Sequence, residues 1–494
     1  MSVTSLTPLQ RQSVLKTLKT PRLLTIEVLA GLVTALALIP EALAFAVVAG
    51  VDPRIGLFAS VTMAMTIAIM GGRPAMVSGA AGSTALVIAP LTASHGVPYL
   101  VAGILLAGVL QILLAVVGVA KLMRFIPRQV MVGFVNALAI LIFSSQLPQL
   151  VGVPWLVYPL VVVGMVLVFG LPKISESIPA PLITIAVLTA FTIFAGVKVP
   201  TVGDFGALPD SLPHLTALAV PLTLDTLTTV FPFSLAVAFV GLVESLMTAK
   251  LVDDISDTHS NKTRESWGQG VANIVTALFG GMGGCAMIGQ TMINVKTGRA
   301  RTRISTFCAG LFVLILSVAF GEIVGRIPMA ALVAVMILVA FSTFDWHSVT
   351  PRTWRNTPKS ETAVMVLTVL VTVFTHNLAL GVGVGILLSL IMFARKVAHV
   401  VQVERVLSAD EQSVSYKISG PLFFASSNDL YFQFSYAEDP KNVEIDMSES
   451  HVWDASSVSA LDSIGAKYES LGKTLTIGGL NEASYALNQK VSER

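Results

Sequence analysis

The chain has 494 residues, of which 54% are hydrophobic and 12% are charged, and its formal net charge is +2. Soluble domains carry about 25% charged residues, so this composition excludes an ordinary soluble protein and indicates an integral membrane protein. The small net charge gives no support for nucleic-acid binding, and two cysteines cannot form a disulfide framework.

Apolar segments occupy most of the first 400 residues. A membrane span needs about 20 apolar residues, and a segment that stops midway needs fewer. On this criterion the pattern predicts about fourteen segments. Their ranges are 25–50, 56–70, 82–94, 98–120, 128–147, 154–171, 179–196, 228–250, 266–279, 289–298, 304–324, 328–344, 360–377 and 379–400.

The basic residues predict how these segments are oriented. If successive segments cross the membrane in opposite directions, the loops lie alternately inside and outside. Only Arg54, Lys198 and Arg326 then fall in outer loops, and the other arginines and lysines of the loops fall inside. Positive charge marks the cytoplasmic side, so both termini are expected in the cytoplasm and the protein in the cell (inner) membrane. Seven segments per half predict two repeats, about 25–196 and 228–400, of inverted orientation. Residues 1–400 are thus a predicted transmembrane domain.

Glu41 and Glu244 are lone carboxylates at corresponding places in the two repeats. An acidic residue inside a bilayer is costly and marks a functional candidate. Burial raises the pKa of a carboxylic acid, so each could take up a proton near neutral pH, or could coordinate a sodium ion. Both are therefore predicted coupling-ion residues for H⁺ or Na⁺. The alternative is a protonated, hydrogen-bonded carboxyl group with a structural role only.

A glycine-rich break follows each glutamate, at 71–79 and 280–289, and a short apolar segment follows each break. Two half-helices that point their N-termini at one another would create an anion site from backbone N–H groups. The alternative is that the glycines only allow close helix packing. Cys285 lies in the second break and is expected to be accessible to water when the cavity is open. The predicted substrate-binding residues are Ser83, Thr84, Ala286, Met287, Gly289 and Gln290.

Beyond residue 400 the pattern changes to that of a soluble domain. Alternating segments at 414–418, 443–447 and 475–479 predict strands, and 457–471 predicts a helix. Strands that alternate with helices indicate a small α/β domain at about 405–494.

These motifs together resemble the SulP-type anion transporters, the sulfate permeases and solute carriers with a cytoplasmic STAS domain. The similar segments are Gly31–Ala46 around Glu41, Ala249-Lys250, Asn273–Gly281, Thr291–Asn294, Gly420–Phe424, Ile445–Ser448, Asp454–Ser457 and Gly478–Asn481. The resemblance implies a uracil-permease-like fold with core and gate domains, secondary anion transport, and often a homodimer. Sulfate, bicarbonate, chloride and dicarboxylates are among the family's substrates.

One position departs from the family pattern. Many relatives carry a basic residue at the start of the tenth segment, where this chain has Gln290. The loss of a fixed positive charge favours a dicarboxylate or bicarbonate, carried together with a cation, over sulfate. The predicted function is therefore secondary active symport of a small anion by alternating access, with no enzymatic activity and no cofactor.

Two other functions remain open. An anion channel or exchanger of the same fold would use the glutamates structurally, and only a coupled transporter moves its substrate uphill. A nucleobase permease shares the fold, but the STAS-like segment argues against it. The chain contains no Gly-Lys-Ser phosphate loop, which gives ATP-driven transport no support.

Overall fold

The structure is a computed structural model. It describes residues 13–122, 126–174, 180–206, 211–216, 218–221, 223–398, 401–409, 411–427 and 430–492. The chain divides into two compact units, Met1–Ile386 and Leu387–Arg494.

In its described residues, the first unit consists of helices, connecting loops and two short strands, β1 (Ser78–Gly79) and β2 (Cys285–Ala286). Helix α17 runs across the division between the units. The helices are α1 (Val14–Lys19), α2 (Pro21–Ala49), α3 (Pro53–Met70), α4 (Gly82–Val117), α5 (Val119–Leu122), α6 (Arg128–Gln146), η2 (Leu147–Leu150), α7 (Val157–Ile174), α8 (Ala180–Phe194), η3 (Val202–Phe205), α9 (Leu224–Ser256), α10 (Lys262–Leu278), α11 (Ile288–Met292), η4 (Ile293–Thr297), α12 (Arg303–Ala319), α13 (Gly321–Gly325), α14 (Met329–Thr343), η5 (Trp346–Val349), α15 (Pro351–Asn356), α16 (Lys359–Thr375) and α17 (Leu378–Ala398).

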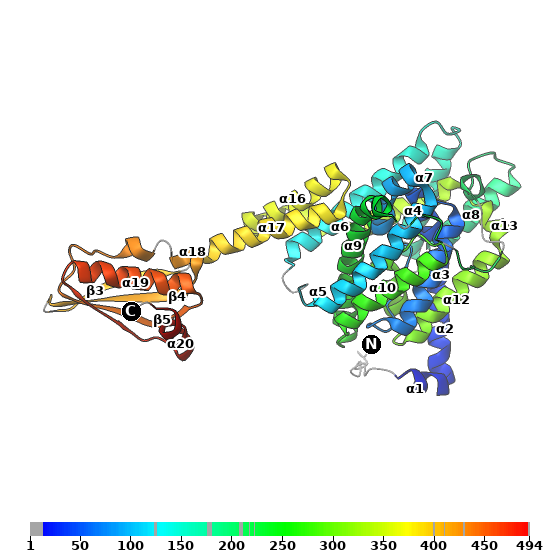
Figure 1. Ribbon diagram of the computed structural model, residues 1–494. Helices are drawn as coiled ribbons and strands as arrows, with labels where there is room; N and C mark the ends of the chain where they lie inside the picture. Colours follow the sequence, from blue (N-terminus) through cyan, green and yellow to red (C-terminus); the bar gives the residue numbers. More distant parts are fainter. Residues whose placement is uncertain are drawn as a thin grey trace, which may run out of the picture. The chain divides into compact units, whose positions relative to one another are not determined.

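The helices of the two sequence halves are interleaved, so that each half packs mainly against the other (Figure 1). Helix α4 packs against α9 and α10, and α12 packs against α2 and α3. A second group is formed by α6, α7, α14 and α16, in which α6 contacts α14 and α16 and α7 contacts α14.

Six helices in the described part of the chain are long and apolar enough to cross a membrane: α2, α3, α4, α6 together with η2, α9 and α17. Four more apolar helices are shorter, namely α7, α8, α12 and α14. Each range predicted from the sequence overlaps a helix, although α9 is longer than the predicted 228–250. The count of fourteen membrane-crossing segments stays a prediction.

The predicted segments 82–94 and 98–120 form one bent helix, α4. Gly96 lies at the bend with φ 77° and ψ −177°, a backbone conformation that side chains with a Cβ rarely adopt. Pro98 follows and cannot donate a backbone hydrogen bond. The first limb of α4 is therefore a short helix that begins at the first glycine-rich break.

The second unit is a four-stranded sheet with helices, in the strand order β3-β4-β5-β6. β3 pairs antiparallel with β4, while β4, β5 and β6 are parallel. Its elements are β3 (Gln402–Leu407), β4 (Ser413–Leu422), α18 (Phe424–Ser427), η6 (Leu430–Gln433), β5 (Asn442–Val452), α19 (Ala455–Ser470), β6 (Thr474–Gly478) and α20 (Glu482–Val491). The sequence predicted β4, β5, β6 and α19 but neither β3 nor α20.

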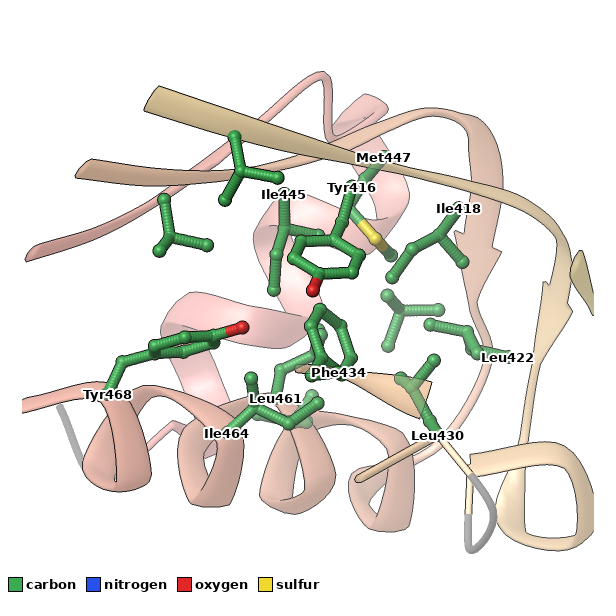
Figure 2. Close-up of a cluster of buried hydrophobic side chains, with 14 residues drawn as sticks. Tyr416, Ile418, Leu422, Leu430, Phe434, Ile445, Met447, Leu461, Ile464 and Tyr468 are labelled. Atoms are coloured by element: carbon green, nitrogen blue, oxygen red, sulfur yellow. The ribbon is translucent and has the colours of Figure 1, made fainter. Parts of the chain in front are cut away.

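The core of this unit lies between one face of the sheet and α19 (Figure 2). Alternate residues of β4 and β5 are buried, because successive side chains of a strand point to opposite faces. Helix α19 contributes residues at helical spacing, so that one stripe faces the sheet. The core comprises Val414, Tyr416, Ile418, Leu422, Leu430, Phe434, Val443, Ile445, Met447, Val452, Val458, Leu461, Ile464 and Tyr468.

Asp439 is a buried carboxylate that satisfies polar groups beside this core. It accepts hydrogen bonds from the Tyr416 hydroxyl at 2.8 Å and the Tyr468 hydroxyl at 2.6 Å, and it pairs with Arg405 at 2.8 Å. Burial, with the Asp439 carboxylate beside it, raises the pKa of Tyr468, so this phenol remains a donor.

Asp439→Ala is expected to destabilise the C-terminal unit by about 2–4 kcal/mol, because it leaves two buried hydroxyl groups without an acceptor. Faster amide hydrogen exchange in β4 and β5 of the full-length protein would measure the loss. Glu449→Gln is the control, since the exposed Glu449–Lys417 pair contributes little. Equal exchange in both variants would contradict the structural role of Asp439.

Candidate anion site

The two glycine-rich breaks meet at the centre of the first unit. β1 of the first break pairs antiparallel with β2 of the second, with Ser78 opposite Ala286 and Gly79 opposite Cys285. Both strands are buried. Non-helical backbone inside a membrane domain needs internal hydrogen bonds, and this pairing supplies part of them.

Side chains from α9 and α10 complete the hydrogen bonding of the second break. Asn273 accepts from the Gly284 N–H at 2.9 Å and donates to the Gly284 carbonyl at 3.1 Å. The Ala286 N–H donates to Ser245 Oγ at 3.0 Å, and Thr248 Oγ1 donates to the Ala286 carbonyl at 3.2 Å. β2 is thus held between the two helices that flank it.

A helix begins directly after each strand. α4 starts at Gly82, three residues beyond β1, and α11 starts at Ile288, two residues beyond β2. α11 continues into the π-helical turn η4. The N-cap residues of these helices are Ala81 and Met287, and neither side chain accepts a hydrogen bond from the N–H groups of the first turn. Both helix starts therefore offer backbone donors suited to an anion.

Glu244 of α9 lies against the start of α4. The Ser83 hydroxyl donates to Glu244 Oε2, and the Cys285 thiol donates to the same oxygen at 3.2 Å. Glu244 is 7% exposed. The carboxylate therefore joins both helix starts, one through Ser83 and the other through the β2 residue Cys285.

Glu41 of α2 lies against the start of α11, where it shares a side-chain hydrogen bond with Gln290. Gln290 is buried, while Glu41 is partly exposed. Each of the two glutamates predicted from the sequence thus contacts a residue in the first turn of one half-helix: Glu244 contacts α4, and Glu41 contacts α11.

The other predicted substrate-binding residues are placed differently. Ser83, Thr84, Ala286 and Met287 are buried, and the Thr84 hydroxyl donates to the Ala81 carbonyl at 3.0 Å. Gly289 is exposed, and a Cβ added there would meet no atom within 4 Å. An anion could therefore approach the start of α11 from the side of Gly289.

Cys285 is buried, with 0% of its surface exposed in this structure. The sequence predicted a thiol that is accessible to water when the cavity is open, and access in such an open state stays a prediction. Its thiol donates to Glu244 instead of facing a cavity, because β2 pairs with β1 on one side and packs against α9 on the other. Cys308, which lies in α12, is partly exposed.

A hollow of about 260 Å³ opens between α6 and α9 close to this region. This α6–α9 hollow reaches Ile288, the residue next to Gly289. It carries two basic and two acidic side chains. The lining residues are Arg128, Met131, Val132, Val135, Met247, Lys250, Leu251, Asp254, Ile288 and Asp345.

Two further buried carboxylates, Glu27 and Glu265, were not singled out from the sequence. Glu27 accepts the N–H groups of Arg301, Thr302 and Ser305, and Glu265 accepts those of Gly72 and Arg73. Both satisfy backbone groups that would otherwise be unpaired. Their position near a helix start, rather than in the middle of a span, is the sequence signal that separates them from Glu41 and Glu244.

The fold and the paired half-helices define a helical membrane transporter rather than an enzyme. The chain belongs to the sulfate permease family, because the sequence model of that family matches residues 24–157 and 155–368. The model of the STAS domain matches residues 402–491. This confirms the resemblance seen in the sequence, including the C-terminal α/β domain.

Similar proteins cover most of the chain. The "Putative sulfate transporter YbaR" of Bacillus subtilis (strain 168) is 48% identical over 94% of this chain and 96% of its own length. The "Bicarbonate transporter BicA" of Picosynechococcus sp. is 26% identical over 78% of this chain and 72% of its own. The structure of the murine Solute Carrier 26 family member A9 anion transporter shares the fold, with a TM-score of 0.80 and 18% identity over 94% of this chain and 87% of that one.

Proposed function

We propose that this protein is a secondary active transporter that carries a small anion together with a proton or a sodium ion. The observation that carries the proposal is the arrangement of two half-helix starts, joined by the β1–β2 pair, with one glutamate against each. The backbone N–H groups would bind the anion. Glu41 and Glu244 would take up the coupling cation when the anion binds.

The substrate is proposed to be a dicarboxylate or bicarbonate. Gln290 puts a neutral amide beside Glu41 where a basic side chain would fix a positive charge. Without that charge, the anion's negative charge is offset by the helix ends and by the co-transported cation. A site of this kind suits an anion that enters together with a cation.

Sulfate is the second candidate, because the Bacillus subtilis relative that is 48% identical is named for it. The substrates are distinguished by uptake into proteoliposomes from a panel of sulfate, bicarbonate, succinate, fumarate and chloride. Each anion is tested with no gradient, with an inward proton gradient and with an inward sodium gradient. Uphill accumulation of sulfate alone would reject the preference for carboxylates.

Alternating access is proposed to open the site toward the cytoplasm through the α6–α9 hollow, since that hollow is lined by Lys250 of α9, the last residue of a segment predicted to end on the inside. The protein is proposed to reside in the inner membrane as a homodimer, with its N-terminus and the STAS domain in the cytoplasm. An exchanger or a channel would also pass anions through such a site. Only the proposed symporter accumulates anion when the sole driving force is a cation gradient.

Truncation after Val401 is expected to lower the expression or rate of transport while anion binding persists. All residues of the proposed site lie within 1–400, and few contacts cross an ordinary domain linker. Binding is measured by titrating the purified truncated protein with the anion identified in the uptake panel. A truncated protein that inserts normally but binds no anion would overturn this expectation.

A further inference from the structure

A second hollow, of about 270 Å³, lies between the first residues of α6 and the segment η5–α15, and it is separate from the β1–β2 site. This α6–α15 hollow is mostly polar, with two arginines and one histidine in its wall. It shares Arg128, Val132 and Asp345 with the α6–α9 hollow. The lining residues are Arg128, Gln129, Val132, Asp345, His347, Ser348, Arg352, Thr353, Asn356 and Thr357.

The two arginines are available to a ligand. Arg128 is the first residue of α6 and Arg352 belongs to α15, and both are exposed. Among the described residues, neither guanidinium group takes part in a hydrogen bond or an ion pair. Two guanidinium groups across a small hollow suit an anion with several oxygen atoms, a phosphate in particular.

The acidic groups of this region are mostly engaged elsewhere. Asp345 also lines the hollow, but its Oδ1 accepts the His347 N–H at 3.1 Å. Glu361 of α16 accepts from the Gln129 amide at 3.4 Å. The hollow therefore carries two arginine charges against one carboxylate, and its net charge is positive.

The surroundings of the hollow are those of a membrane surface. α6 together with η2 is long and apolar enough to cross a membrane, and the first residue of a membrane-crossing helix is expected near the end of the hydrocarbon layer. Trp346 and Trp354 flank the same segment and are 50% and 52% exposed. Their indole N–H groups donate to the carbonyls of Phe341 and Ser348 at 2.8 and 2.9 Å. The Trp346 ring also packs against Phe341 and Phe344, with ring centroids 4.6 and 4.8 Å apart, so only its exposed half remains for lipid. Tryptophans of this kind are typical of the interface between lipid and water.

We propose that the α6–α15 hollow binds the phosphate of an anionic lipid headgroup, such as phosphatidylglycerol, through Arg128 and Arg352. Trp346 and Trp354 pack beside the glycerol and acyl ends of that lipid. A hollow of this size holds a headgroup and not a whole lipid, so the acyl chains stay in the bilayer. Because Arg128 also lines the α6–α9 hollow, the bound lipid fixes a charge at the entrance proposed for the transported anion.

The test uses the purified full-length protein in a neutral detergent. Its thermal midpoint is measured against added dioleoyl-phosphatidylglycerol, dioleoyl-phosphatidylcholine or inorganic phosphate. Only phosphatidylglycerol is expected to raise the midpoint, because ligands that bind the folded state stabilise it. Arg352→Gln is expected to weaken the apparent affinity about tenfold, the effect of losing one charged hydrogen bond of about 1.4 kcal/mol.

Arg355→Gln is the matched control, because Arg355 is exposed on the same short helix but does not line the hollow. It should keep the wild-type response to phosphatidylglycerol. Equal shifts with both lipids, or an unchanged affinity in Arg352→Gln, would reject the site. If inorganic phosphate abolishes the effect of phosphatidylglycerol, the ligand of the hollow is a soluble phosphate and not a lipid. Each variant is first checked for a wild-type midpoint without added lipid.

Discussion

Glu244→Gln is expected to abolish uphill anion uptake, so that the internal concentration never exceeds the equilibrium value. The amide is close in shape to the carboxylate and still offers an oxygen to the Ser83 hydroxyl and the Cys285 thiol. It cannot take up a proton, and it binds a sodium ion far more weakly than a carboxylate. The variant should therefore fold and bind anion while losing the link to the cation gradient.

The measurement is uptake into proteoliposomes under an imposed proton or sodium gradient, with exchange of labelled anion at equilibrium recorded in parallel. Glu322→Gln is the control, because Glu322 is a strongly exposed carboxylate that pairs with Arg326 and makes no hydrogen bond to either half-helix start among the described residues. Concentrative uptake by the Glu244 variant would falsify the coupling role. Glu41→Gln is expected to act in the same direction.

Gly284→Ala is expected to disrupt the site by separating the two strands. A Cβ at this position would lie 1.9 Å from the Gly79 carbonyl oxygen of the facing break. Backbone cannot rotate away as a side chain can, so the β1–β2 pair must open. We expect a loss of stability of about 3 kcal/mol, at the upper end of the usual cost of overpacking, together with loss of anion binding.

Gly289→Ala is the matched control for folding, because the added methyl group meets no atom within 4 Å. Both variants are compared by the thermal midpoint of the purified protein and by anion titration. Gly289→Ala should keep the wild-type midpoint, whatever its effect on the anion. A wild-type midpoint for Gly284→Ala would show that the two breaks are not tightly paired.

The sequence predicted the helical membrane unit, both glycine-rich breaks and the two glutamates, because each depends on composition or on a repeated pattern. It could not predict that β1 pairs with β2, since this register is set by the packing of α4, α9 and α10. The burial of Cys285 follows from the same packing. Only a folded chain shows which surface of the second break faces water.

In the C-terminal unit, too, some elements could be predicted from the sequence and others could not. β4, β5, β6 and α19 carry regular patterns and were predicted, whereas β3 is mostly exposed and has no alternation to detect. Likewise, Ser245 and Thr248 hold β2, yet they are ordinary polar residues one and four positions after Glu244. The available signal was the helical spacing of Thr248 from both Glu244 and Ser245, and only the contacts with Ala286 show what these side chains do.

The interleaving of the two sequence halves limits how the protein could move. α4 belongs to the first half but packs against α9 and α10 of the second, and the β1–β2 pair ties both half-helices together. The halves therefore cannot rock against each other without breaking this pair. We propose that the interleaved helices α2, α3, α4, α9, α10 and α12 instead slide as one group past α6, α7, α14 and α16. Both glutamates would then move together with the bound anion as parts of one rigid body. The α6–α9 hollow would lie at the surface between the moving and the stationary helices.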